Sequence, residues 1–139
     1  MKSDKIKPYT IAFLLGAIVG LLIVLPFYIK GNGIFYLGSD FVEQEITFWT
    51  YCNQAIKSGN IFYTSSVDLG YSFIGLFSYY GIGSPFFWLS LLIPATRLYK
   101  FIGLLLVLKM AVATTTAFAY ARQYVQNINY AIIAGLMYA

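Results

Sequence analysis

The uncharged run "YTIAFLLGAIVGLLIVLPFYI", residues 9–29, limits what this chain can fold into more than any other feature. A helix of 21 residues is about 30 Å long, which matches the hydrocarbon core of a bilayer. A signal peptide usually has a shorter apolar core, of about 7–15 residues, that ends in small residues. Because this run is longer and continues into "KGNG", we predict an uncleaved first membrane span.

Composition places the chain among the integral membrane proteins. Of its 139 residues, 60% are hydrophobic and 10% are charged, whereas a soluble domain has about 25% charged residues. Aromatic residues make up 19%, which suits belts at the membrane–water boundaries. The net charge of +4 comes from scattered lysines and arginines, so we expect no nucleic-acid partner. The chain has no histidine, which excludes Ser-His-Asp and Cys-His catalysis and any histidine-ligated metal.

Further apolar segments predict an all-α, polytopic membrane protein. The expected spans lie at about 9–29, 84–96, 101–121 and, incomplete, from about 130. Pro85 favours a helix that begins near residue 84, because proline is tolerated in the first turn; the alternative start is near residue 73. Ten apolar residues before Ala139 cannot cross a bilayer. We therefore expect residues 1–139 to be the N-terminal fragment of one transmembrane domain.

The distribution of lysine and arginine predicts the orientation, because these residues favour the cytoplasmic side. With three complete spans, the cytoplasmic group is Lys2, Lys5, Lys7, Arg97 and Lys100, and the outer group is Lys30, Lys57 and Arg122. If the second segment does not cross, the count becomes four against four. In both cases we place the N-terminus in the cytoplasm and a long loop, about 30–72, outside. That loop carries four acidic residues, Asp40, Glu43, Glu45 and Asp68.

The stretch "SDFVEQEITFWTYCNQAIKSGN" in this loop predicts a short amphipathic helix on the outer membrane surface. Asp40, Glu43 and Gln44 have i, i+3, i+4 spacing and share one face. "DFVE" fits a capping box in which Asp40 is the N-cap and Glu43 returns the hydrogen bond. Gly59 is expected to end the helix just after Lys57.

Asp40 and Glu43 also have a functional interpretation, which the capping role does not exclude. A carboxylate at the outer surface can act as a general base toward a hydroxyl, or can hold a divalent cation against a phosphate. Both tasks suit a lipid-phosphate-linked substrate, whose head group lies at that level. A cation at Asp40 with Glu43 is the one cofactor that we consider, although two carboxylates do not complete its coordination sphere.

Two other features are candidates for contact with a substrate. Lys109 lies about 13 Å beyond Lys100 along the third expected span, near mid-membrane, where an ionisable residue usually has a partner and a function. Its alternatives are a structural ion pair and a side chain that extends to the interface. Tyr79 and Tyr80 belong to the aromatic run "FSYYGIGSPFFW", which predicts either interfacial packing or the lining of a lipid or sugar site.

The order of these elements resembles the beginning of the YfhO family of bacterial multispan membrane proteins. The matching segments are "YLGSDFVEQ", "AIKSGNIFYTSSVDLGYSF", "SYYGIGSPFFWLSLLIP" and "LVLKMAVATTTAFAYAR". They contain the family's Gly-x-Asp element after the first span, its "YY…SPF" element and its intramembrane lysine. The resemblance runs from about Phe35 to Arg122 and rests on order and spacing, since no single element is specific.

The resemblance implies a GT-C-like glycosyltransferase of the bacterial cytoplasmic membrane. Such enzymes move a sugar from a polyprenyl-phosphate carrier to an acceptor on the outer face, here a cell-envelope polymer such as lipoteichoic acid. They use an acidic residue just after the first span for catalysis or metal binding, and Asp40 matches that position. Lys109 matches the family lysine, for the carrier phosphate or a structural pair. Glu43, Tyr79 and Tyr80 are supporting candidates for substrate binding, and the fragment alone is expected to be inactive.

A non-enzymatic membrane protein, either a transporter segment or an assembly partner, is the alternative. It would use Lys109 as a pathway or pairing residue and Asp40 as a helix cap. Four of the five acidic residues are expected outside the membrane and one ionisable residue within it, which favours the transferase.

Overall fold

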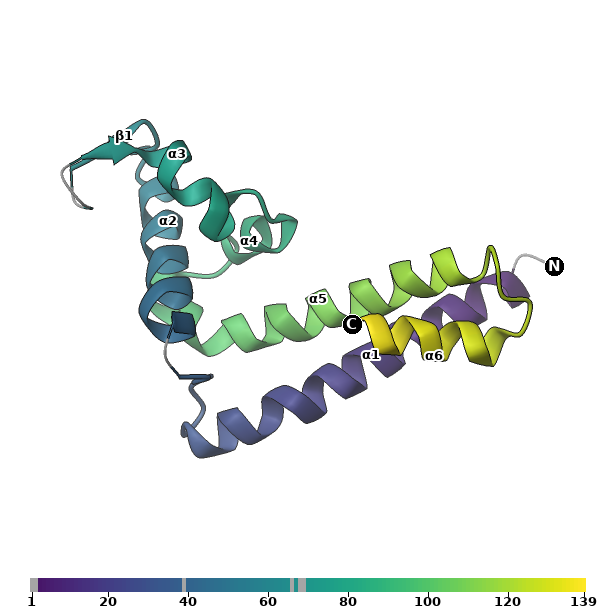
Figure 1. The fold of residues 1–139 in the computed structure, drawn as a ribbon. Helices are drawn as coiled ribbons and strands as arrows, with labels where there is room; N and C mark the ends of the chain where they lie inside the picture. Colours follow the sequence, from purple (N-terminus) through teal and green to yellow (C-terminus); the bar gives the residue numbers. More distant parts are fainter. Residues whose placement is uncertain (1–2, 39, 66, 68–69) are drawn as a thin grey trace. The chain divides into compact units, whose positions relative to one another are not determined.

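Figure 1 shows the computed structural model, which describes residues 3–38, 40–65, 67 and 70–139. Within these ranges the regular elements are helices apart from one short β-hairpin, and turns and loops connect them, which confirms the all-α prediction. Asp68, which we placed in the outer loop, lies outside them. The chain divides into two compact units, Met1–Pro26 with Leu104–Ala139 and Phe27–Gly103, and each has its own packing.

The first unit consists of long helices and the second of short elements. Most of α1 (Ser3–Lys30) and α5 (Leu98–Ala121) belongs to the first unit, together with α6 (Ile128–Tyr138). Between α1 and α5 the second unit contains η1 (Phe41–Ile46), α2 (Thr47–Lys57), β1 (Tyr63–Thr64), β2 (Tyr71–Ser72), α3 (Phe73–Phe77), η2 (Ser78–Ile82), α4 (Pro85–Ser90) and η3 (Ala95–Arg97). The strands β1 and β2 pair antiparallel.

The helices α1 and α5 correspond to the first and third predicted spans. Among the residues that the structure describes, Ile6–Lys30 and Ala95–Ala121 are the two segments long and apolar enough to cross a membrane. Along their contact, residue numbers rise on α1 as they fall on α5. The facing pairs are Tyr9 with Phe118, Gly16 with Thr114 and Gly20 with Val107. The two helices are therefore antiparallel, and the chain between them lies on one side of the membrane.

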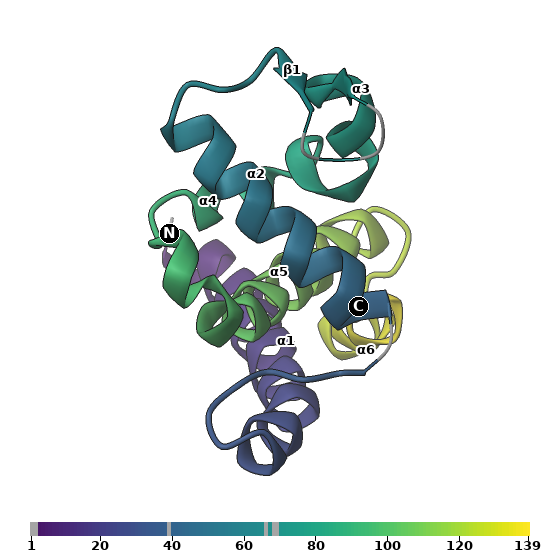
Figure 2. The same cartoon turned by 90° about the vertical axis from the view of Figure 1, so that its left-hand side faces the viewer.

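Small residues let α1, α5 and α6 approach one another closely. Ala12, Gly16 and Gly20 are buried at four-residue spacing on α1, the pattern that permits close helix contact in membranes. A Cβ atom on Gly16 would lie 2.4 Å from Thr114 Oγ1, and a Cβ atom on Gly135 of α6 would lie 2.7 Å from the Thr114 carbonyl oxygen. Figures 1 and 2 show the three helices side by side.

The expected second span, 84–96, does not form a membrane-crossing helix, and this prediction is corrected. The helix α4 has six residues, a length of about 9 Å. Pro85 begins it as predicted, but Pro94, with an extended ψ of 135°, prevents its continuation. The alternative start near residue 73 also fails, because Gly81 breaks the helical backbone with φ 173° and ψ −37°.

With this correction, the segment that we expect outside the membrane becomes longer. It runs from the end of α1 to the start of η3 instead of over about 30–72. With two crossings, four lysines or arginines lie on each side: Lys2, Lys5, Lys7 and Arg122 against Lys30, Lys57, Arg97 and Lys100. The charge count therefore no longer favours either orientation.

The predicted amphipathic helix is present as η1 and α2, and its apolar side chains pack against other elements of the second unit. Trp49 is buried, its ring lies 5.4 Å from that of Phe87, and its indole N–H donates to the Tyr80 carbonyl at 2.7 Å. The helix ends after Lys57, as predicted. Gly59 has φ +76°, and its neighbour Asn60 donates back to the Ala55 carbonyl.

Polar side chains of α2 also hold the end of α4. The Asn53 amide donates to the carbonyls of Ser90 at 2.9 Å and Ile93 at 3.3 Å. One helical turn later, the Lys57 ammonium donates to the same Ile93 carbonyl at 2.7 Å. These bonds tie α2 to the turn that follows α4, so Lys57 has a structural role.

Replacing Gly16 by leucine is expected to destabilise the helix packing of the first unit. The added side chain would overlap Thr114, and overpacking of this kind costs about 1–3 kcal/mol. Thermal unfolding of the detergent-solubilised protein should show a lower midpoint. Ile18→Leu on the same helix is the control, because the Ile18 side chain is exposed. An unchanged midpoint in Gly16→Leu would contradict the close packing of these helices.

Candidate functional site

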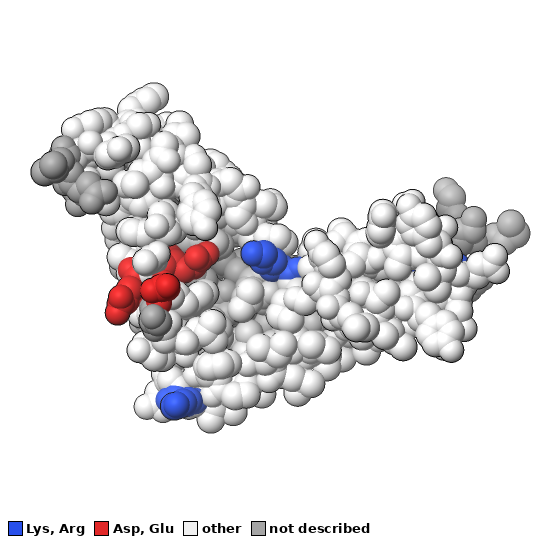
Figure 3. Space-filling model, viewed as in Figure 1, with Lys and Arg blue, Asp and Glu red and all other residues white. Residues whose placement is uncertain are grey.

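Three carboxylates gather at the start of the helical segment formed by η1 and α2. Figure 3 shows one red patch of acidic side chains. The acidic residues whose side chains the structure describes are Asp40, Glu43 and Glu45. Asp40 and Glu43 are exposed, whereas Glu45 is half-buried. The predicted grouping of Asp40 with Glu43 is therefore present, on the side of the membrane to which α1 leads.

The backbone around these carboxylates does not form the predicted capping box. Asp40 has helical dihedral angles, φ −53° and ψ −29°, and its side chain makes no capping hydrogen bond to this helix. A capping box requires an extended backbone at the N-cap. The capping explanation for Asp40 is therefore wrong.

The cause is that η1 is wound as a π-helix, with hydrogen bonds from residue i to residue i+5. The Thr47 hydroxyl donates to the Val42 carbonyl, five residues earlier, at 3.1 Å. This winding places Asp40 and Glu45 one turn apart. The 3.6-residue period of an α-helix, on which the sequence prediction was based, does not place these two residues one turn apart. π-Helical turns are rare and frequently occur at functional sites, so the winding supports a special role for this segment.

The two candidate tyrosines have different environments. Tyr80 packs into the second unit, with its ring 4.5 Å from that of Phe48 and its carbonyl bonded to the Trp49 indole. The side chain of Tyr79 is 90% exposed, and its ring is perpendicular to that of Tyr80 at 5.3 Å. Tyr79 therefore has an exposed aromatic ring, whereas Tyr80 packs beneath it in the second unit.

Phe35 anchors the segment that leads from α1 to the carboxylates. Its side chain is 1% exposed, and its ring lies 5.9 Å from Phe27, 5.6 Å from Tyr28 and 5.3 Å from Phe41. A Cβ atom on Gly103 of α5 would lie 2.9 Å from the Phe35 ring. Because Phe41 follows Asp40 directly, this cluster fixes the start of η1 relative to the end of α1.

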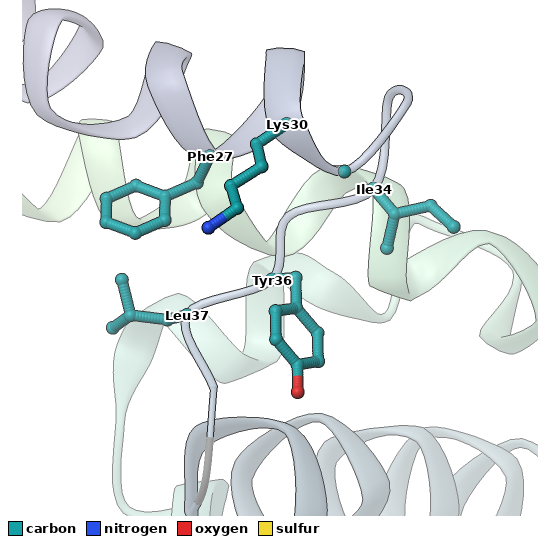
Figure 4. Close-up of a pocket in the computed structure, with 6 residues that line it drawn as sticks. Phe27, Lys30, Ile34, Tyr36 and Leu37 are labelled. Atoms are coloured by element: carbon teal, nitrogen blue, oxygen red, sulfur yellow. The ribbon is translucent and has the colours of Figure 1, made fainter.

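A cavity of about 440 Å³ lies beside this cluster, and sequence reasoning missed it. Its lining is apolar except for one lysine and comprises Phe27, Lys30, Gly31, Ile34, Tyr36 and Leu37. Figure 4 shows the Lys30 side chain extending past the Phe27 ring toward Leu37. The sequence signal was the lysine directly after the first span, which we used only as an orientation marker.

Lys109 belongs to the first unit, whereas the carboxylates and tyrosines belong to the second. It lies on α5 about 16 Å from the start of that helix, and its mid-membrane position stays a prediction. Its side chain is exposed, and it makes no hydrogen bond or ion pair with any residue in the described ranges.

Neither a three-ligand metal cluster nor an activated thiol is present in the described part of the chain. No group of three or more His, Cys, Asp or Glu side chains there could hold a metal ion, so Asp40 and Glu43 are not part of a complete cage. Cys52 is buried in α2, and burial raises the pKa of its thiol to about 12. A thiol that stays protonated at neutral pH is a poor nucleophile.

Comparison with known proteins adds one match. The family model described as bacterial membrane protein YfhO matches residues 12–139. The matched region contains the whole second unit, α5, α6 and most of α1. No curated protein and no solved structure matches the chain.

Truncation of Phe35 is expected to loosen the candidate site. Phe35→Ala removes a fully buried ring, and such changes cost about 3–5 kcal/mol of unfolding free energy. Limited proteolysis of the membrane-embedded protein should then cleave faster between residues 31 and 47. Tyr36→Ala is the matched control, because that ring is mostly exposed. Equal protection in the two variants would show that Phe35 does not anchor the site.

Proposed function

We propose, from the premise that this chain belongs to the YfhO family of bacterial membrane proteins, that it contributes to a membrane glycosyltransferase. The enzyme would move a sugar from a polyprenyl-phosphate carrier to a cell-envelope acceptor, such as lipoteichoic acid, on the outer face of the cytoplasmic membrane. The observation that carries the proposal is the exposed carboxylate of Asp40. It lies in the chain shortly after the first crossing helix, at the start of η1.

Asp40 is the proposed general base. The acceptor hydroxyl oxygen forms a bond to the anomeric carbon of the sugar, while the bond between that carbon and the carrier phosphate oxygen breaks. The hydroxyl proton passes to the Asp40 carboxylate, and the carrier leaves with its negative phosphate. Such a step needs no nucleotide site. It does need positive charge near the phosphate, because negative charge develops on the leaving group.

The other candidate residues have supporting roles in this proposal. Tyr79 offers an exposed ring against which a sugar face can pack. Glu43, exposed on the same π-helical turn as Asp40, can accept hydrogen bonds from sugar hydroxyls. Lys109 is assigned to the carrier phosphate or to a structural ion pair within the membrane.

A divalent cation at Asp40 is a secondary proposal. Asp40 and Glu43 supply hard oxygen ligands, but a cation takes about six or more, so substrate phosphate and water oxygens would have to supply the rest. The proposed proton transfer to Asp40 does not require the ion.

The cytoplasmic placement of the N-terminus is likewise a proposal. Its support is functional, because the carrier sugar and the envelope acceptor meet on the outer face, and the carboxylates lie on the side to which α1 leads. A reporter fused before α1 and one inserted in the α1–α5 segment would distinguish the two orientations.

Lys109 supports a second candidate function, that of a non-enzymatic transporter segment or assembly partner. An exposed lysine at mid-membrane depth fits a pairing residue for another helix or a residue on a transport pathway. Under this hypothesis Lys109→Leu would abolish assembly or transport, whereas Asp40→Asn would have no effect. The transferase hypothesis predicts that Asp40→Asn is the damaging change.

Asp40→Asn in the full-length protein is expected to lower sugar transfer by about 10²–10⁴-fold, the contribution of a general base. Membrane expression should not change, because Asp40 is exposed and does not cap the helix. Transfer is measured as labelled sugar incorporated into the envelope polymer. Glu45→Gln, in the same acidic patch, is the control and should stay close to wild type. Normal transfer by Asp40→Asn would remove Asp40 from the mechanism.

Tyr79→Ala and Tyr80→Ala should have different effects. Loss of the exposed Tyr79 ring is expected to raise the KM for the sugar carrier about tenfold, equivalent to about 1.4 kcal/mol, without changing thermal stability. Loss of the Tyr80 ring, which packs on Phe48, should lower the unfolding midpoint. Kinetics and thermal unfolding of both variants check this. A stability loss in Tyr79→Ala with no change in KM would contradict the assignment.

A further inference from the structure

The cavity beside Phe35 contains a single charged group, the Lys30 ammonium. Among the residues that the structure describes, this ammonium makes no hydrogen bond or ion pair, and the rest of the lining is aromatic, aliphatic or glycine. A lysine at a helix end commonly interacts with the last carbonyls of its helix.

The backbone itself already satisfies the end of α1. The Gly33 amide donates to the Tyr28 carbonyl at 2.9 Å, and the Asn32 amide donates to the Ile29 carbonyl at 3.4 Å. Asn32 has the left-handed φ of 50° that this capping motif requires. The Gly31 amide bonds to the Phe27 carbonyl at 2.8 Å. Lys30 is therefore not needed as a cap, and its charge is available to a ligand.

The position of the cavity defines the chemistry of that ligand. Lys30 is the last residue of a crossing helix and so lies where the hydrocarbon meets water. Ile34, Tyr36 and Leu37, which complete the cavity, are exposed apolar side chains. A ligand that fits both features has an anionic head and a hydrocarbon chain. A volume of about 440 Å³ is at the lower end for a ligand pocket, which suits one chain better than two.

We propose that this cavity binds the phosphate end of the polyprenyl carrier, with the phosphate on Lys30 and the first isoprene units against Phe27, Ile34 and Leu37. This inference rests on the proposed function, because it assumes that the occupant is a sugar carrier. An ammonium–phosphate contact at this site is charge-assisted, and contacts of this kind are stronger than neutral hydrogen bonds.

The site is connected to the proposed base through Phe35. That ring contacts Phe27, which lines the cavity, and Phe41, which follows Asp40. A phosphate on Lys30 is thus held by the same cluster that fixes the carboxylate. Lys109 lies about 16 Å along α5, deeper than a head group, so Lys30 better supplies the positive charge that the leaving phosphate needs.

Equilibrium binding tests this assignment without requiring turnover. The full-length protein in neutral phosphatidylcholine nanodiscs is titrated with radiolabelled farnesyl phosphate, with farnesol and with phosphatidylglycerol. Lys30→Gln is expected to weaken farnesyl phosphate binding about tenfold, equal to 1.4 kcal/mol, and to leave farnesol binding unchanged. Lys30→Arg should retain binding. Lys100→Gln removes the same charge from an exposed lysine outside the cavity lining and should match wild type.

The other outcomes of these binding measurements separate the lysine site from the proposed function. Equal weakening by Lys30→Gln and Lys100→Gln would show a diffuse charge effect and overturn the site. Phosphatidylglycerol binding as tight as that of farnesyl phosphate would make the occupant an ordinary membrane lipid and also overturn it. If sugar transfer persists while Lys30→Gln binds normally, the inference fails and the proposed function stands. Lys30-dependent farnesyl phosphate binding without any transfer would reject the function and leave the site supported.

Discussion

The close approach of two antiparallel crossing helices is the constraint on which the rest of the structure depends. Within a bilayer there is no water to satisfy free backbone groups, so α1 and α5 must be helical throughout the hydrocarbon. No hydrophobic effect drives them together there, and close van der Waals contact must do so. Gly16 and Gly20 provide that contact against Thr114 and Val107. Since the helices are antiparallel, the whole chain between them emerges and returns on one face.

That emerging chain must form a compact unit from short elements, and aromatic residues make this possible. Phe35 and its neighbours join the end of α1 to η1, while Trp49 and Phe48 of α2 pack on Phe87 and Tyr80. Aromatic rings bury a large area per residue, so a unit of short helices can have a core of its own. The carboxylates and the Lys30 cavity both lie on this framework.

Several features could be predicted from local sequence because their causes are local. Length and hydropathy predict α1 and α5, and Gly59 after Lys57 marks the end of α2. The family resemblance on ordered short segments agrees with the family match over residues 12–139. The grouping of Asp40 with Glu43 also follows from their spacing alone, since residues so close in sequence stay close in any helix.

The sequence by itself therefore determined the membrane class, the two crossing helices, the family and the position of the acidic patch. Only the tertiary structure decided the rest. It showed that Pro85 and Pro94 leave a short helix where a span was expected, and that the apolar face of α2 is covered by protein. It also showed the π-winding at Asp40 and the cavity at Lys30. The physical reason is that hydropathy records which surfaces avoid water, but not whether lipid or protein covers them.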